Sequence, residues 1–123
     1  KDSHPKRLGQ IAEKVLELLK EFSPEQMAIE TLFFSKNVKT AMKVSEARGV
    51  LIGICAKEGL LVNEYSPQAI KVAVTGSGSS DKSQVIKMVG ILTGIDLKKK
   101  IDDEVDAIAV GLTCLATLRN IPN

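Results

Sequence analysis

The sequence predicts an α/β domain in which a sheet lies between helices. Two short apolar runs, at residues 26–34 and 60–65, alternate with longer segments whose apolar residues recur at helical spacing. Three further helical segments follow the second run, and no internal repeat is present. With 123 residues, of which 44% are hydrophobic and 26% charged, the chain is long enough to bury one core.

Composition excludes several classes of site. His4 is the only histidine, and Cys55 and Cys114 lie in apolar helical segments without metal-ligand spacing. A zinc site, a Cys-His nucleophile and a disulfide framework are therefore not expected, and a reducing cytoplasm suits the chain. The charged opening is no signal peptide, and no segment reads as a membrane span. The net charge of +2 is too small to indicate nucleic acid by itself.

A first helix is predicted from Pro5 to Phe22, and a buried strand is predicted at residues 26–34. Apolar residues recur every three or four positions in the helix, and a Ser-Pro pair ends it. Glu30 follows three apolar residues of the strand. A carboxylate within or at the end of a buried strand is costly unless it is paired or binds a metal. The alternative is a strand residue whose side chain faces outward.

A long helix is predicted from Val38 to Glu58, with Gly59 as its left-handed cap. Its apolar and small residues lie on more than one face. One face is expected to meet the sheet and another to meet a second subunit. Gly49 in the middle of the helix suggests that another backbone approaches closely there.

The segment after the second strand contains two helices joined by a Gly- and Ser-rich loop. Ser66 and Pro67 have the order of an N-cap and a first helical residue, and we expect a helix through Val74. The following loop, residues 75–83, resembles a P-loop, but that motif requires glycine directly before the lysine, where Asp81 stands. The loop is either a plain connector or a segment that presents Lys82 to a phosphate backbone.

The last helix begins with acidic residues and continues as an apolar run. Asp103 and Asp106 are three apart, so both project from one face of its first turn. One explanation is capping, because acids at a helix start complement the dipole, and Asp102 is the expected N-cap. The other is a site for divalent cations, which prefer hard oxygen ligands. Glu30 supplies the partner carboxylate that the second explanation needs.

Several motifs, in order, resemble the RuvC family of Holliday junction endonucleases, in the ribonuclease H-like superfamily. The matching segments are Ala-Ile-Glu-Thr-Leu-Phe-Phe-Ser-Lys-Asn at residues 28–37, Glu-Ala-Arg-Gly-Val at 46–50, Glu-Tyr at 64–65, Lys-Ser-Gln-Val at 82–85 and Asp-x-x-Asp-Ala-x-Ala at 103–109. The resemblance implies a ribonuclease H-like mixed sheet flanked by helices. It also implies a bacterial, cytoplasmic homodimer that nicks two symmetric strands of a four-way DNA junction and works with a junction-migrating helicase complex.

The same resemblance assigns the site. Glu30, Asp103 and Asp106 match three of the family's catalytic acids, which hold two Mg²⁺ ions, with Mn²⁺ as a possible substitute. Phe33 matches an aromatic residue that contacts bases. The remaining residues matched to DNA binding are Lys36, Asn37, Lys71, Lys82 and Ser83.

One departure concerns the family's first catalytic aspartate, which lies on an opening strand in a Gly-Ile-Asp-Pro-Gly-like motif. No such motif occurs in this sequence. We therefore expect residues 1–123 to be a single nuclease domain that lacks its N-terminal strands, and this fragment alone to be inactive if that segment is missing. A junction-binding protein without cleavage and a monomeric ribonuclease H-like relative that processes RNA are the alternatives.

Overall fold

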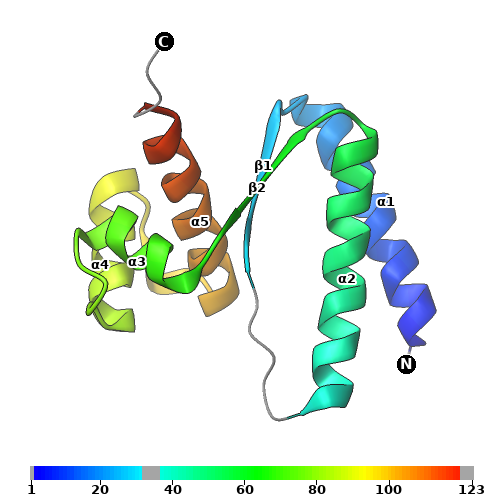
Figure 1. Ribbon diagram of the computed structural model, residues 1–123, viewed down its shortest axis with the longest axis horizontal. Helices are drawn as coiled ribbons and strands as arrows, with labels where there is room; N and C mark the ends of the chain where they lie inside the picture. The colour runs from blue at the N-terminus through cyan, green and yellow to red at the C-terminus, as the bar shows by residue number, and fades with distance from the viewer. Residues whose placement is uncertain (1, 32–36, 120–123) are drawn as a thin grey trace. The chain divides into compact units, whose positions relative to one another are not determined.

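The computed structural model describes residues 2–31 and 37–119 of the chain. Its elements, in order, are α1 His4–Phe22, β1 Gln26–Glu30, α2 Val38–Lys57, β2 Leu61–Tyr65, α3 Pro67–Thr75, α4 Lys82–Thr93, the short 3₁₀ helix η1 Leu97–Lys99 and α5 Asp102–Arg119 (Figure 1). The chain forms two compact units, one from residues 1–27 and 32–62 and the other from residues 28–31 and 63–123. No helix in the described ranges is both long enough and apolar enough to cross a membrane.

The helix boundaries follow local capping chemistry. Ser66 accepts a hydrogen bond from the Ala69 N–H and Pro67 is the first helical residue, as predicted. Asp81, the residue that rules out a P-loop, is the N-cap of α4. It forms a capping box with Gln84, in which each side chain accepts a backbone N–H of the other residue. The left-handed conformation predicted for Gly59 after α2 is confirmed at φ 88°, and Gly94 ends α4 in the same conformation at φ 70°.

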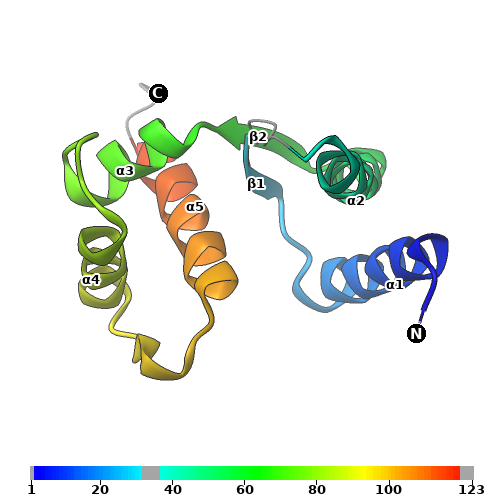
Figure 2. The same cartoon turned by 90° about the horizontal axis from the view of Figure 1, so that it is seen from below.

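The first unit is a pair of helices with little buried surface. Helices α1 and α2 lie side by side (Figures 1 and 2), and His4 Nε2 lies 3.6 Å from Glu46 Oε1 between them. Of the described residues in this unit only Cys55 is buried. Val38, Met42 and Val44 of α2 are exposed. Val38 and Met42 are four residues apart and share one face of α2, so this helix has exposed apolar side chains on a face away from Val44.

The two strands form a parallel pair. At one end the Leu61 N–H donates to the Glu25 carbonyl (3.1 Å), and at the other the Thr31 N–H donates to the Tyr65 carbonyl (2.8 Å), so both strands run in the same direction. Of the strand predicted over residues 26–34, β1 covers Gln26–Glu30 and Thr31 is not part of it, while residues 32–34 lie outside the described ranges. All five β1 residues are half-buried rather than buried, because within the described chain the strand has one hydrogen-bonded neighbour.

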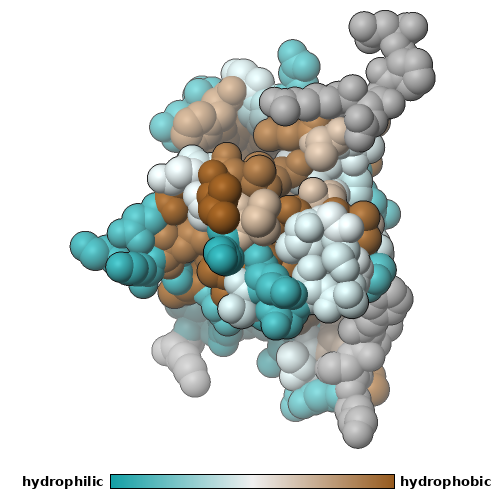
Figure 3. Space-filling model, turned by 90° about the vertical axis from the view of Figure 1, so that its left-hand side faces the viewer, coloured by the Kyte–Doolittle hydropathy of each residue, from teal (hydrophilic) through white to brown (hydrophobic). Residues whose placement is uncertain are grey.

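The second unit contains the main core. Helices α3, α4 and α5 pack together (Figure 2), and the face formed by α3 and α4 shows apolar side chains among hydrophilic ones (Figure 3). Val89 at its centre is fully buried. The other buried members of this cluster are Ile70, Val74, Val85, Val105, Ala109 and Val110. The helical prediction for residues 66–74 is confirmed.

The start of α5 differs from the prediction. Asp102 is the first helical residue and not the N-cap. The Ile101 carbonyl already accepts the N–H groups of Glu104 and Val105, so the helix extends one residue further toward the N-terminus than expected. Three acids, Asp102, Asp103 and Glu104, thus occupy the first turn, where they complement the helix dipole.

Candidate active site

Core packing fixes two charged residues on neighbouring helices. Lys82 opens α4 and lies one turn before the buried Val85, while Asp106 lies one turn before the buried Ala109 on α5. Residues three apart on a helix share a face, so each charged side chain sits beside a residue held in the core. The core of the second unit therefore determines where both charges stand.

A pocket of about 240 Å³ lies over this part of the core. Glu30, the last residue of β1, brings a second carboxylate to it, and Lys71 of α3 brings a second amine. The full lining consists of Glu30, Pro67, Ile70, Lys71, Lys82, Val85, Asp106 and Ala109. Four elements of the second unit thus converge on a site with an apolar floor and two charges of each sign.

An ion pair joins the charged groups of two helices. Lys82 Nζ donates to Asp106 Oδ1 at 2.7 Å. The hydrogen bond to Asp106 is the main cause of a raised pKa of Lys82, and the charges of Asp102 and Glu30 act in the same direction. With side-chain exposures of 53% for Lys82 and 43% for Asp106, the pair remains accessible to solvent.

The carboxyl of Glu30 has a raised pKa in this site. Partial burial is the main cause of a raised pKa of its carboxyl, and the negative charge of Asp106 adds to the shift, while Lys82 opposes it. A carboxyl whose pKa is raised by burial and by a neighbouring carboxylate, in a pocket that also holds a cation, is a candidate for a functional group.

The raised pKa of Glu30 predicts a pH-dependent stability difference. Below its usual value of 4.5 the carboxyl is protonated in both folded and unfolded chains. As pH rises through the higher pKa of the folded state, the wild-type chain loses stability, because the unfolded state ionises more readily. Without divalent cations, Glu30→Gln should therefore melt modestly above wild type at pH 7, with a difference that shrinks toward pH 4. Thermal melts followed by circular dichroism in a chelating buffer measure this, and a difference independent of pH would contradict it.

The structure brings together some of the residues predicted from the sequence. Glu30, Lys71, Lys82 and Asp106 line one pocket. Asp103 is exposed in the first turn of α5 and is not part of that lining.

Two of the other residues predicted to bind DNA, Asn37 and Ser83, are described by the structure and are not in the lining of this pocket. Asn37 is the N-cap of α2, where its side chain accepts the Thr40 N–H at 3.2 Å. Ser83 is exposed in the first turn of α4. Phe33 and Lys36 lie outside the described residues.

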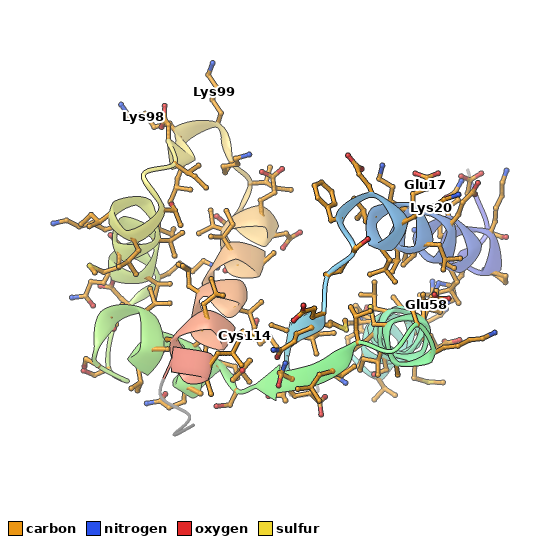
Figure 4. All side chains as sticks on the ribbon, turned by 90° about the horizontal axis from the view of Figure 1, so that it is seen from above. Glu17, Lys20, Glu58, Lys98, Lys99 and Cys114 are labelled. Carbon is orange, nitrogen blue, oxygen red and sulfur yellow. The ribbon has the colours of Figure 1, made fainter. Side chains whose placement is uncertain are left out.

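Some residues at or near the pocket were not predicted from the sequence. Asp102, expected only as a cap, is among the charges that act on Lys82. Pro67 and Ile70 contribute to the pocket wall, and only the position of Pro67 at a helix start gave a signal. Lys98 and Lys99 do not line the pocket and project outward from η1 (Figure 4).

The donor chemistry of the pocket fits a divalent cation. Among the residues that the structure describes, no three His, Cys, Asp or Glu side chains are grouped closely enough to form a complete metal site. Mg²⁺, however, commonly takes one or two carboxylates and completes its coordination with water and substrate phosphate. Glu30 and Asp106 are the two carboxylates in the pocket, and a cation bound there would offset the charge of Asp106 that raises the pKa of Glu30.

Comparison with known proteins decides the family. A family model described as crossover junction endodeoxyribonuclease RuvC matches residues 1–114. The chain belongs to the RuvC family. It is 50% identical over 111 residues to RuvC of Thermosipho melanesiensis, covering 90% of this chain and 70% of that protein. RuvC of Natranaerobius thermophilus is 48% identical over 111 residues, covering 90% and 69%.

Solved RuvC structures share the fold. Thermus thermophilus RuvC superposes with a TM-score of 0.86 at 32% identity, covering 96% of this chain and 71% of that one. A structure of T. thermophilus RuvC in complex with Holliday junction substrate gives a TM-score of 0.89 at the same identity, covering 96% and 72%. The predicted α/β fold of the ribonuclease H-like type is thereby confirmed.

Proposed function

We propose that the chain resolves four-way DNA junctions by hydrolysing phosphodiester bonds in two symmetric strands. The observation that carries this is the pocket in which Glu30 and Asp106 meet Lys71 and Lys82 in a RuvC family chain. It is supported by the likeness to T. thermophilus RuvC, which was solved with a Holliday junction substrate. As the family implies, the setting is the bacterial cytoplasm, beside a helicase complex that migrates junctions.

The residues divide the chemistry between them. Glu30 and Asp106, with Asp103 from the same helix turn as a third acid, would hold two Mg²⁺ ions, or Mn²⁺ in their place. Such ions lower the pKa of an attacking water and stabilise the leaving oxygen. The two lysines that line the pocket would neutralise and orient the phosphate.

Junction selectivity must come from shape. Lysine contacts to phosphates add salt-dependent affinity that is nearly independent of sequence. Lys71 and Lys82 therefore hold any DNA strand that reaches the pocket. We propose that Phe33, Lys36, Asn37 and Ser83 add contacts that favour a branched, deformable substrate over linear duplex.

The test is a cleavage and binding assay on the complete wild-type protein, including any residues that precede Lys1. A labelled four-way junction and a linear duplex of the same sequence are incubated with Mg²⁺ or with a chelator. We expect paired nicks in the junction, only with the metal, and weak binding to the duplex. Binding of the junction without nicks under all metal conditions would favour a non-cleaving binding protein, and preferential cleavage of an RNA–DNA hybrid would favour an RNA-processing enzyme.

We also propose that the exposed apolar face of α2 joins two copies of the chain. Two nicks at symmetric positions need two sites, and Met42 is 59% exposed on that face. Met42→Glu should shift the protein to monomers, because a charge would then be buried in the interface. Lys43→Glu introduces a carboxylate at the neighbouring exposed position and should leave the dimer intact. Sedimentation velocity distinguishes the two, and equal masses for both variants would contradict this interface.

A further inference from the structure

Lys82 holds the oxygen of Asp106 that a cation would otherwise approach. Its Nζ is 2.7 Å from Asp106 Oδ1, a distance typical of a charge-assisted hydrogen bond. The charges of Asp102 and Glu30 also favour an ammonium at this position. Lys82 is thus a counter-ion of Asp106, and it would compete with a metal ion for that carboxylate.

The ion pair is weak enough for Lys82 to exchange Asp106 for another partner. Both side chains are about half exposed, and exposed ion pairs contribute only about 0–1 kcal/mol. Lys82 also lines the pocket that a phosphate would enter. A phosphate oxygen is an equally good acceptor for an ammonium, so the side chain can leave Asp106 without losing a charged partner.

We propose that Lys82 is a positioning residue that moves from Asp106 to a DNA phosphate, and thereby makes metal and DNA bind cooperatively. This inference rests on the proposed function, since it assumes that the pocket takes both a phosphate and a divalent cation. In the free protein Lys82 lowers the affinity for the cation. When DNA takes Lys82, Asp106 is released as a ligand and the cation binds more tightly.

Thermodynamic linkage makes the effect measurable from either side. If DNA raises the affinity for the metal, the metal must raise the affinity for DNA by the same factor. The factor is limited by the strength of the ion pair that is given up, which corresponds to roughly a two- to fivefold change.

Lys71 provides a matched control. It lines the same pocket and carries the same charge, but it forms no ion pair with any residue in the described part of the chain. Lys71→Met therefore removes one positive charge from the pocket without releasing Asp106. Lys82→Met removes the same charge and also the contact.

The experiment measures junction affinity with and without a cation. A fluorescently labelled four-way junction is titrated with wild type, Lys82→Met or Lys71→Met at constant ionic strength, in chelator or in Ca²⁺, which takes oxygen ligands as Mg²⁺ does. Both variants should bind DNA more weakly. In wild type and Lys71→Met, Ca²⁺ should tighten binding roughly two- to fivefold more than in Lys82→Met. Calorimetry without DNA should show Ca²⁺ binding tightest in Lys82→Met.

The outcomes separate this inference from the proposed function. An equal Ca²⁺ effect in wild type and Lys82→Met would overturn the exchange of Lys82, even if the junction is bound and cleaved. Loss of the Ca²⁺ effect in Lys71→Met as well as Lys82→Met would also overturn it, because pocket charge alone would then account for the coupling. A wild-type protein that binds neither junction nor Ca²⁺ would refute the proposed function itself, and this inference with it.

Discussion

Asp106→Asn is expected to slow cleavage of a four-way junction by roughly 100-fold or more, since even the outer-shell partners of metal ligands are worth 10- to 100-fold. The change removes a negative oxygen ligand from the pocket and keeps the size of the side chain. Val105 and Ala109 hold this part of α5 in the core, so the helix should not move. Single-turnover cleavage of a labelled junction in Mg²⁺ gives the rate.

Glu104→Gln is the control for that variant. It is the same type of change in the first turn of the same helix, but Glu104 is exposed, outside the pocket lining and 3.5 Å from Lys100. Its cleavage rate should stay close to that of wild type. Junction binding should persist in both variants, because the proposed contacts to the DNA phosphates are made by Lys71 and Lys82. Equal losses of cleavage in the two variants would mean that the general charge of the helix start matters, and would contradict a specific role of Asp106.

Variants of two further acids of α5 test which of them is the third metal ligand. The family resemblance assigns that role to Asp103, whereas the charge of Asp102 is the one that acts on Lys82. We expect Asp103→Asn to abolish cleavage as Asp106→Asn does, and Asp102→Asn to retain it. The reverse result would place the ligand at Asp102.

The sequence alone predicted the acids of the site better than their surroundings. Glu30 stood out because a carboxylate after an apolar run needs a partner, and Asp106 because it lies three residues from another acid on one helix. The structure places both in one pocket. Local patterns thus indicated where two of the carboxylates lie, whereas their role as metal ligands comes from the family resemblance and stays a prediction.

What the sequence could not give depends on contacts between distant segments. Lys82 and Asp106 are 24 residues apart, and nothing in either local pattern pairs them. The pairing arises only once Val85 and Ala109 pack in one core. The start of α5 was misplaced by one residue, because Ile101, whose side chain cannot cap, takes the position expected for Asp102.

Val89→Ala is expected to destabilise the second unit by about 2 kcal/mol, and to lower its melting temperature by several degrees. Val89 is 0% exposed and lies at the centre of the α3, α4 and α5 core. Removing two methyl groups there loses their burial and leaves a cavity that rigid helices fill only in part. Urea denaturation followed by circular dichroism measures the loss.

Val72→Ala is the matched control, since it makes the same change on α3 at a side chain that is 48% exposed. It should alter stability by no more than about 0.5 kcal/mol. Val89 and Lys82 lie on the same helix, but Val89 does not line the pocket. Val89→Ala should therefore cleave junctions near the wild-type rate well below its melting temperature, whereas Asp106→Asn should be folded and inactive. A slow but fully folded Val89→Ala protein would show that core packing positions Lys82 more finely than the pocket contacts indicate.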